Sequence, residues 1–293
     1  LPSDYNKILP FFSLRPTLTC ESHFLYHLIW REFYNSKYCI LDHGVLWLQT
    51  IADKNSALLP TCRKEELKNY FLLLQDYFTN HLKEKLKIYL VDEEALEILK
   101  LDPLKYSIVE DRDSFDYIYD GTSLRELRGR KYHKKKNHIN GFLRNYENRY
   151  EYKTLSHLNS DEICSFISDW AKDKNSDDPY KRIESEERAI KDILDYYPHL
   201  QAKMAGIYID NHLEAFTIGS YDPQLKMALI HIEKANGSIR GLYPFINQQF
   251  LINEFPHAIY INREDDMGIP SLRKAKESYQ PIKMAKKYRI TEL

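Results

Sequence analysis

With 293 residues, the chain is too long for one ordinary hydrophobic core and suits two domains of roughly 100–150 residues each. Its formal net charge of −1 gives no overall attraction to nucleic acid or membrane, so such binding would need a local patch. Four cysteines without a CxxC pair and 11 histidines without ligand spacing argue against a zinc site and a disulfide framework, and fit a reducing cytosol.

The sequence shows neither a membrane span nor a secretory signal. No stretch approaches the roughly 20 apolar residues that cross a bilayer, and residues 1–4 lack a basic region followed by an apolar one. We therefore expect a cytoplasmic protein without a transmembrane segment.

The first half opens with a loop and continues with helices, a hairpin and further strands. Asp42-His43-Gly44 separates two β-rich runs, which predicts a hairpin. Leu67, Phe71 and Leu74 recur at helical spacing and predict an amphipathic helix. In chain order we expect a helix over 21–33, strands over 38–41, 45–48 and 57–60, a helix over 64–80, a strand over 87–91, a helix over 93–100 and a strand over 115–119.

The second half repeats this order of elements. We expect a strand near 152–155, helices over 161–170 and 184–196, hairpin strands over 206–209 and 213–218, a strand over 227–233, a helix over 242–253, a strand over 258–262, a helix over 271–277 and a terminal strand. Two motifs of the first half return in the second: Ile40-Leu41-Asp42 as Tyr208-Ile209-Asp210, and Ile88-Tyr89 as Ile259-Tyr260, at offsets of 168 and 171 residues. The near-constant offset indicates an internal duplication.

The element order of the second half resembles that of the GNAT acyltransferase fold. The long segment 261–281, together with 233–235 and 241–248, further resembles a bacterial family related to the C-terminal domain of phosphatidylglycerol lysyltransferase. The glycine-plus-basic segment 127–140 is similar to a helix of that domain. The resemblance implies an α/β (α+β) protein of two tandem GNAT-like (acyl-CoA N-acyltransferase) domains, each a mixed sheet flanked by helices. We expect an N-terminal domain over 1–120, a basic connecting helix over 121–148 and a C-terminal domain over 149–293.

The connecting segment is the main candidate for anion binding. Between Gly121 and Tyr150 there are nine lysines or arginines against two glutamates. We expect Lys131, Lys134, Lys135 and His138 to face phosphate, while Tyr132, Lys136, Ile139 and Leu143 pack on protein. The predicted phosphate-binding residues are Arg130, Lys131, Lys134, Lys135 and Asn140. A solvated inter-domain helix is the alternative.

The acidic segment after strand 258–262 is the main candidate for chemistry. In a GNAT-like sheet the parallel strands 227–233 and 258–262 part at one end, and ligands bind near such strand ends. We expect Glu233, Glu264 and Asp266 to orient an amine or act as a base, and Asn262 to hold the reacting carbonyl. Capping of the following helix is the alternative role of these acids.

The loop before helix 242–253 is a weaker phosphate candidate. Acetyl-CoA enzymes of this fold carry Q/R-x-x-G-x-G/A there, so that amides at a helix N-terminus hold pyrophosphate. This chain has Arg240 and Gly241 but lacks the second spaced glycine, which weakens a CoA-dependent interpretation. Arg273 and Lys274 form a second small basic patch. His157, His199, His231 and His257 are isolated in sequence and are interpreted as structural.

Taken with the family resemblance, these residues predict an aminoacyl or acyl transferase. Its donor would be anionic, such as aminoacyl-tRNA, and its acceptor a small molecule or a lipid head group; neither a metal nor another cofactor is required. An acetyl-CoA-dependent N-acetyltransferase and a non-catalytic module that binds an anion or nucleic acid are the alternatives.

Overall fold

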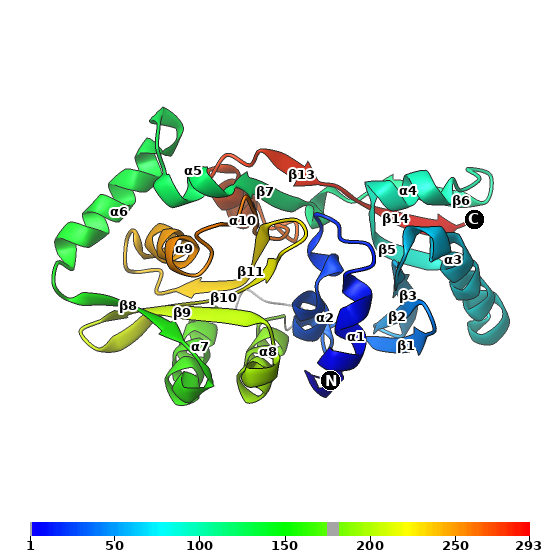
Figure 1. Cartoon of the computed structure of the whole chain (residues 1–293), viewed down its shortest axis with the longest axis horizontal. Helices are drawn as coiled ribbons and strands as arrows, with labels where there is room; N and C mark the ends of the chain where they lie inside the picture. The colour runs from blue at the N-terminus through cyan, green and yellow to red at the C-terminus, as the bar shows by residue number, and fades with distance from the viewer. Residues whose placement is uncertain (1, 175–181) are drawn as a thin grey trace.

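The computed structural model describes residues 2–174 and 182–293, which contain two mixed β-sheets side by side (Figure 1). The first sheet has the strand order β1 (Lys37–Leu41), β2 (Gly44–Ile51), β3 (Lys54–Leu58), β5 (Lys87–Asp92), β14 (Lys287–Glu292), β6 (Tyr106–Glu110), and β4 (Thr61–Cys62) pairs with β2. The second has the order β13 (Lys283–Ala285), β7 (Asp116–Asp120), β12 (Tyr260–Asn262), β11 (Met227–Ala235), β10 (His212–Asp222), β9 (Ala202–Ile209), β8 (Tyr150–Leu155).

Helices cover both faces of the second sheet. The helices of the first half are α1 (Tyr5–Phe12), α2 (Phe24–Trp30), α3 (Leu67–Asp76), α4 (Glu93–Leu99) and α5 (Gly121–Glu126). Those of the second half are α6 (His133–Asn145), α7 (Ser160–Lys174), α8 (Arg182–Tyr196), α9 (Leu242–Asn253) and α10 (Pro270–Glu277). Helices α7 and α8 lie on one face of the second sheet, whereas α9 lies on the other (Figure 1). None of these helices combines the length and the apolar character that crossing a bilayer requires.

Both predicted hairpins are present. Strands β1 and β2 pair from Lys37↔Leu48 to Leu41↔Gly44, and β9 and β10 meet at a turn formed by Asp210 and Asn211. The two turn residues have φ angles of 49° and 68°, the left-handed conformation that a tight two-residue hairpin turn requires. Strand alternation and turn chemistry were therefore sufficient to locate these elements.

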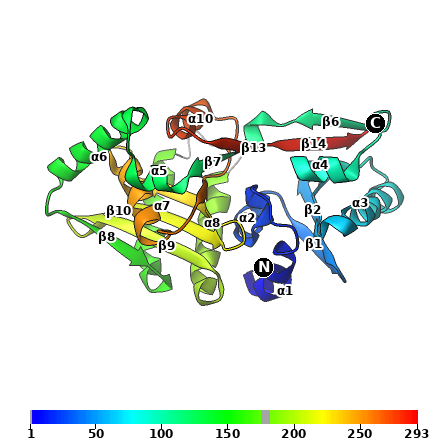
Figure 2. The same cartoon turned by 45° about the horizontal axis from the view of Figure 1, so that its top comes forward.

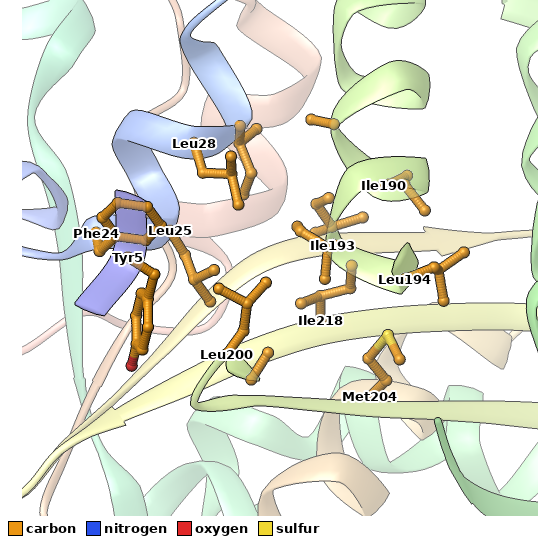
Figure 3. Packing of buried hydrophobic residues seen from close by; sticks show 14 of the residues in the cluster. Tyr5, Phe24, Leu25, Leu28, Ile190, Ile193, Leu194, Leu200, Met204 and Ile218 are labelled. Carbon is orange, nitrogen blue, oxygen red and sulfur yellow. The ribbon is translucent and has the colours of Figure 1, made fainter. Parts of the chain in front are cut away.

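The chain begins with a helix where the sequence predicted a loop. Tyr5, Ile8 and Phe12 of α1 are buried, at the i, i+3, i+7 spacing of one helical face. Figure 3 shows Tyr5 beside Phe24 and Leu25 of α2, and α2 in turn faces Ile193 of α8 and Ile218 of β10, within one cluster of buried residues. One hydrophobic core thus joins the N-terminal helices to the second sheet.

The internal duplication is visible in the topology. In each sheet an antiparallel hairpin continues into a third antiparallel strand, and a helix then leads to a parallel neighbour. The parallel pairs are β3 with β5, at Ala57↔Ile88 and Leu58↔Tyr89, and β11 with β12, which starts at Met227↔Tyr260. Both parallel ladders are very short.

The sheets exchange one strand each, so sheet membership differs from the expected boundaries at residues 120 and 149. Strand β7, expected in the first domain, lies between β12 and β13 of the second sheet. Strand β14, expected in the second domain, lies between β5 and β6 of the first sheet. Figure 2 shows β13 and β14 following each other from one sheet to the other. Local patterns identified these segments as strands, but their partners depend on long-range packing.

The basic connecting segment is broken, not one continuous helix over 121–148. Helix α5 ends at Glu126. The next residue, Leu127, has a left-handed φ of 48°, and Gly129 follows with a φ of 92°. Helix α6 then starts at His133. This break sets the rotation of α6 and hence which lysines face inward.

Candidate functional site

The predicted parting of β11 and β12 is present. The two strands pair only at Met227↔Tyr260, Ala228↔Ile261 and Leu229↔Asn262, while β11 continues to Ala235. Beyond β12 the chain follows β7: the Arg263 amide donates to the Tyr117 carbonyl at 3.1 Å, and the Tyr117 amide donates to the Glu264 carbonyl at 3.2 Å. Glu264 has a left-handed φ of 53°. We call the region between β11 beyond Leu229 and residues 263–264 the split.

On one face of the sheet, charged side chains bridge the split. Arg263 Nη2 donates to Glu233 Oε1 at 2.8 Å, and Asn247 Nδ2 of α9 donates to Glu233 Oε2 at 2.7 Å. The side chains of Arg263 and Glu233 are each 11% exposed. Tyr279 lies beside this pair, with its ring centroid 4.6 Å from the Arg263 Cζ. A carboxylate held in this way is oriented for proton transfer or for binding an amine.

On the other face, three side chains form a hydrogen-bonded series that the sequence analysis missed. Ser220 Oγ lies 2.8 Å from His231 Nε2, and His231 Nδ1 lies 2.8 Å from Glu264 Oε1. Burial lowers the pKa of His231 to about 3 and raises that of Glu264 to about 8. These directions favour a neutral carboxyl that donates to a neutral imidazole.

The series depends on a β-bulge. The register of β10 and β11 shifts between Ile218↔Ile232 and Gly219↔Ile230, so His231 is the additional residue. The bulge directs His231 to one face and Glu233 to the other. Sequence reasoning treated His231 as isolated because a bulge has no reliable sequence signal, although the hairpin pairing does bring Ser220 opposite Leu229, close to His231.

The other two residues predicted for the site, Asn262 and Asp266, form hydrogen bonds within the protein. Asn262 is fully buried; its amide donates to the Leu18 carbonyl at 2.8 Å and to Asp116 Oδ2 at 3.1 Å, and its oxygen accepts from the Glu264 amide. Holding a substrate carbonyl would require breaking one of these bonds. The structure thus places Asn262 as the link between β12 and the N-terminal segment.

Asp266 is held by residues outside the split. It is fully buried and accepts hydrogen bonds from Arg112, Tyr117 and Arg273. The hydrogen bonds from Arg273 and Tyr117 outweigh burial and lower the pKa of Asp266, which makes it a poor base. The second basic patch is divided accordingly: Arg273 is paired with Asp266 and Asp113, whereas Lys274 is exposed.

The predicted basic residues lie in three different places. Arg130, Lys131 and Lys134 are exposed to solvent. Lys135 turns inward, and its Nζ lies 3.9 Å from the centroid of the Tyr279 ring. Asn140 and Arg240 line a hollow on the outer side of α6, with a cavity volume of about 540 Å³, together with Asn137, His138, Gly141, Arg144 and Asn145.

The expected faces of α6 are therefore wrong in two positions. Lys135 shares the inward face with the buried residues Tyr132, Ile139 and Phe142, and Lys136 is exposed instead of packed. Burial, and secondarily the charge of Arg263, lowers the pKa of Lys135 to about 8. Tyr132, Ile139 and Phe142 are spaced by seven and three residues, so the sequence did contain the signal that places Lys135 on their side.

The loop before α9 is held against α6. Gly241 has a φ of 93°, and a Cβ at this position would lie 2.2 Å from the carbonyl oxygen of His138. Arg240 Nε donates to His138 Nδ1 at 3.2 Å. The glycine is thus explained by a close backbone contact between the loop and α6.

A buried charged cluster joins the two sheets. Lys287 of β14 places its Nζ 2.6 Å from Glu21 Oε1, 2.8 Å from Asp116 Oδ1 and 3.4 Å from Cys20 Sγ. The ligand atoms of Cys20, Glu21 and Asp116 lie within 4.8 Å of one another, as in a metal site. The ammonium group already lies among these atoms and supplies a positive charge.

Comparisons with known proteins identify similar chains. The model of the family described as phosphatidylglycerol lysyltransferase, C-terminal, matches residues 12–291. An uncharacterised protein of Mycoplasmoides gallisepticum is 26% identical over 204 residues, which cover 69% of this chain. The match spans only 64% of the length of that curated relative.

Solved structures share the fold over the whole chain. A conserved protein of unknown function from Bacteroides thetaiotaomicron is 28% identical, with a TM-score of 0.90 and coverage of 100% of this chain and 98% of that one. L-PGS from Bacillus licheniformis is 12% identical, with a TM-score of 0.66 and coverage of 98% and 91%. A GNAT-family acetyltransferase from Colwellia psychrerythraea is 10% identical, with a TM-score of 0.53 and coverage of 100% and 97%. The expected fold of two tandem GNAT-like domains is confirmed.

Proposed function

The chain belongs to the family of the phosphatidylglycerol lysyltransferase C-terminal domain, and on this premise we propose that it transfers an acyl or aminoacyl group from an anionic donor such as aminoacyl-tRNA. The acceptor is a nucleophilic amine or hydroxyl of a small molecule or a lipid head group. The observation that carries the proposal is the split between β11 and β12, where Glu233 is held between Arg263 and Asn247.

Glu233 is the residue of the split that best fits a proton acceptor. Its two oxygens are fixed by one hydrogen bond each, at 2.8 and 2.7 Å, and its side chain retains 11% exposure. In the proposed step the acceptor nitrogen or oxygen bonds to the donor's carbonyl carbon, and the bond from that carbon to the donor's leaving oxygen breaks. Glu233 takes the proton of the nucleophile and returns it to the leaving oxygen.

The outer lysines and arginines support an anionic donor. Arg130, Lys131 and Lys134 are exposed, and among the residues that the structure describes they form no ion pair with a carboxylate. Cations left unpaired at a surface bind phosphates with release of counterions, which makes the binding sensitive to salt. A donor with a phosphate backbone fits this surface.

The direct test is transfer of a radiolabelled aminoacyl group from a charged tRNA pool to acceptors in a bacterial small-molecule and lipid extract. We expect Glu233→Gln to lower the transfer rate at least about 100-fold, in the range of general base catalysis. Glu147→Gln, which changes an exposed glutamate, is the matched control. Equal transfer by the wild type and Glu233→Gln would remove Glu233 from the reaction.

The donor is tested separately. Replacing Arg130, Lys131 and Lys134 together by alanine is expected to weaken donor binding and to reduce its salt dependence, with little change in rate at saturating donor. Acetyl-CoA serves as the alternative donor in the same assay. The close contact of Gly241 with α6 disfavours it, because the loop that would hold pyrophosphate is packed against a helix backbone.

A further inference from the structure

We propose that Lys135 and Arg263 form a binding site for one singly charged oxyanion of the substrate, a phosphodiester or a carboxylate, beside the ring of Tyr279. The inference rests on the proposed function, because it assigns this group to the donor or the acceptor that enters the split. It adds Arg263 as a ligand-binding residue and moves Lys135 from the outer basic surface into the split.

The geometry brings both cations to one aromatic ring. Lys135 Nζ of α6 lies 3.9 Å from the Tyr279 centroid, and Arg263 Cζ lies 4.6 Å from the same centroid. Tyr279 is only 4% exposed, so the ring that both cations contact is held in place by its surroundings. An aromatic face attracts cations but leaves their outward N–H groups free to donate to a ligand.

Hydrogen bonding at Arg263 is incomplete. Its Nη2 donates to Glu233, whereas its Nη1 is buried and has no hydrogen-bond partner among the residues that the structure describes. Buried polar groups in proteins are nearly always paired, so an unpaired one marks a position where a water, an ion or a ligand oxygen can bind. A guanidinium group whose Nη1, with its two N–H donors, is unpaired and held in place is suited to oxygens of a carboxylate or phosphate.

The three charged side chains beside Tyr279 carry a net charge of +1. Arg263 and Glu233 neutralise each other, but within residues 2–174 and 182–293 Lys135 has no carboxylate partner. Burial, and secondarily the neighbouring charge of Arg263, disfavours the ammonium form of Lys135 and lowers its pKa. A single negative charge would balance the group, which favours a phosphodiester or a carboxylate over a doubly charged phosphate monoester.

The two exposed lysines nearby provide a comparison. Lys131 also lies over an aromatic ring, that of Tyr132 at 5.0 Å, but it is exposed and has no arginine at the same ring. Lys134 is exposed as well. The proposed site therefore differs from an ordinary surface lysine in burial, in its second cation and in the unpaired Nη1 of Arg263.

Binding is measured on the full chain by calorimetry with dimethyl phosphate and with acetate as probes. We expect Lys135→Gln and Arg263→Gln each to weaken binding of the preferred probe at least about 10-fold, and Lys136→Gln, which changes an exposed lysine of the same helix, to leave it within twofold. Tighter binding of dimethyl phosphate identifies a phosphodiester, and tighter binding of acetate a carboxylate. Equal affinity of the wild type and Lys135→Gln, or no saturable binding of either probe to the wild type, overturns the proposal.

A second measurement does not depend on a variant that folds. Competitive acetylation followed by peptide mass spectrometry gives the titration midpoints of Lys135 and of the exposed Lys136 in the same wild-type sample. Saturating probe should raise the midpoint of Lys135 by about one pH unit or more, because a bound anion favours the ammonium form, and leave that of Lys136 unchanged. An unchanged Lys135 midpoint contradicts the site.

These readouts separate the two proposals, since neither requires turnover. Anion binding without any transfer from charged tRNA would refute the proposed function and leave the site standing. If the wild type transfers the aminoacyl group and the Lys135 variant still binds the probes normally, the anion site is refuted and the proposed function stands.

Discussion

Glu233 of β11 and Arg263, the residue after β12, are joined by a 2.8 Å salt bridge across the point where two parallel strands stop pairing. Backbone hydrogen bonds hold the strands together up to Leu229, and beyond it side chains on both faces take over. The width of the split is therefore set by Glu233 with Arg263 on one face and by His231 with Glu264 on the other. Substitutions there should act on stability as well as on transfer.

The salt bridge predicts strong coupling between its two residues. Arg263→Met leaves the Glu233 carboxylate largely buried without a counter-charge, and we expect the free energy of unfolding to fall by about 3–5 kcal/mol. The double variant Glu233→Gln/Arg263→Met should lose much less, because no buried charge remains. Urea unfolding of the four proteins gives the coupling as a double-mutant cycle.

The exposed pair of Arg149 and Asp210 is the control for this cycle. Their side chains are 52% and 48% exposed, so Arg149→Met should leave the unfolding free energy nearly unchanged. If Arg263→Met lowers the unfolding free energy no more than Arg149→Met does, the salt bridge between Glu233 and Arg263 does not stabilise the split.

The contact between the loop and α6 predicts that Gly241 is irreplaceable. In Gly241→Ala the new Cβ would lie 2.2 Å from the His138 carbonyl oxygen, and the residue would have to keep a φ of 93°. We expect a loss of at least about 3 kcal/mol from the clash and the left-handed strain together. Gly237→Ala in the same loop meets no atom within 4 Å and should be nearly neutral. Thermal unfolding of the two variants makes the comparison; similar melting temperatures would contradict the contact.

Local sequence signals were sufficient to predict those elements whose structure depends on residues that are close together in the chain. The hairpin at Asp210 and Asn211 followed from alternation and turn residues, and the parting of β11 from β12 followed from the family resemblance. Helix α1 was missed, although Tyr5, Ile8 and Phe12 have helical spacing, because the segment contains Pro10 and is short. Its stability comes from packing on α8 and β10, which the sequence does not show.

The functional site was predicted only in part because its contacts cross long distances in sequence. Glu233 and Glu264 were identified as acids near a strand end, but the bulge at His231 that separates their faces was not. Asp266 was grouped with them by adjacency, whereas a tight turn directs it to Arg112 and Arg273. The exchange of β7 and β14 was not predicted, because the sequences of the strands do not show which strand pairs with which.

The strand exchange predicts that Lys287 holds the two sheets together. Lys287 is fully buried between Glu21 and Asp116, so Lys287→Met leaves two buried carboxyls without their counter-charge. We expect the free energy of unfolding to fall by about 3–5 kcal/mol. Lys286→Met is the matched control, since Lys286 is 43% exposed and forms an ion pair with Glu110 at the surface. Urea unfolding of both variants distinguishes them; equal stabilities would show that the cluster contributes nothing.

The buried pair of Glu264 and His231 predicts a specific pH dependence of stability. Burial, with the nearby charge of Asp116, raises the pKa of Glu264 from its usual 4.5 to about 8, although Lys276 and Lys287 oppose the shift. Between these two values the folded protein keeps a proton that the unfolded chain has lost. Linkage then requires stability from this group to be fully present below pH 4.5 and to decline as the pH rises to 8, by up to about 1.4 kcal/mol per pH unit.

Glu264→Gln tests this dependence because an amide donates to His231 as the neutral carboxyl does and does not titrate. We expect the unfolding free energy of the variant, relative to the wild type, to rise steadily between pH 5 and pH 8. Glu21 and Asp265, whose pKa values burial also raises, are present in both proteins, so their titration largely cancels in the difference. Urea unfolding at four pH values measures it, with Glu147→Gln as an exposed control whose difference should stay constant. A difference for Glu264→Gln that does not change with pH would mean that Glu264 is ionised in the folded protein, and the carboxyl would then accept from His231 instead of donating to it.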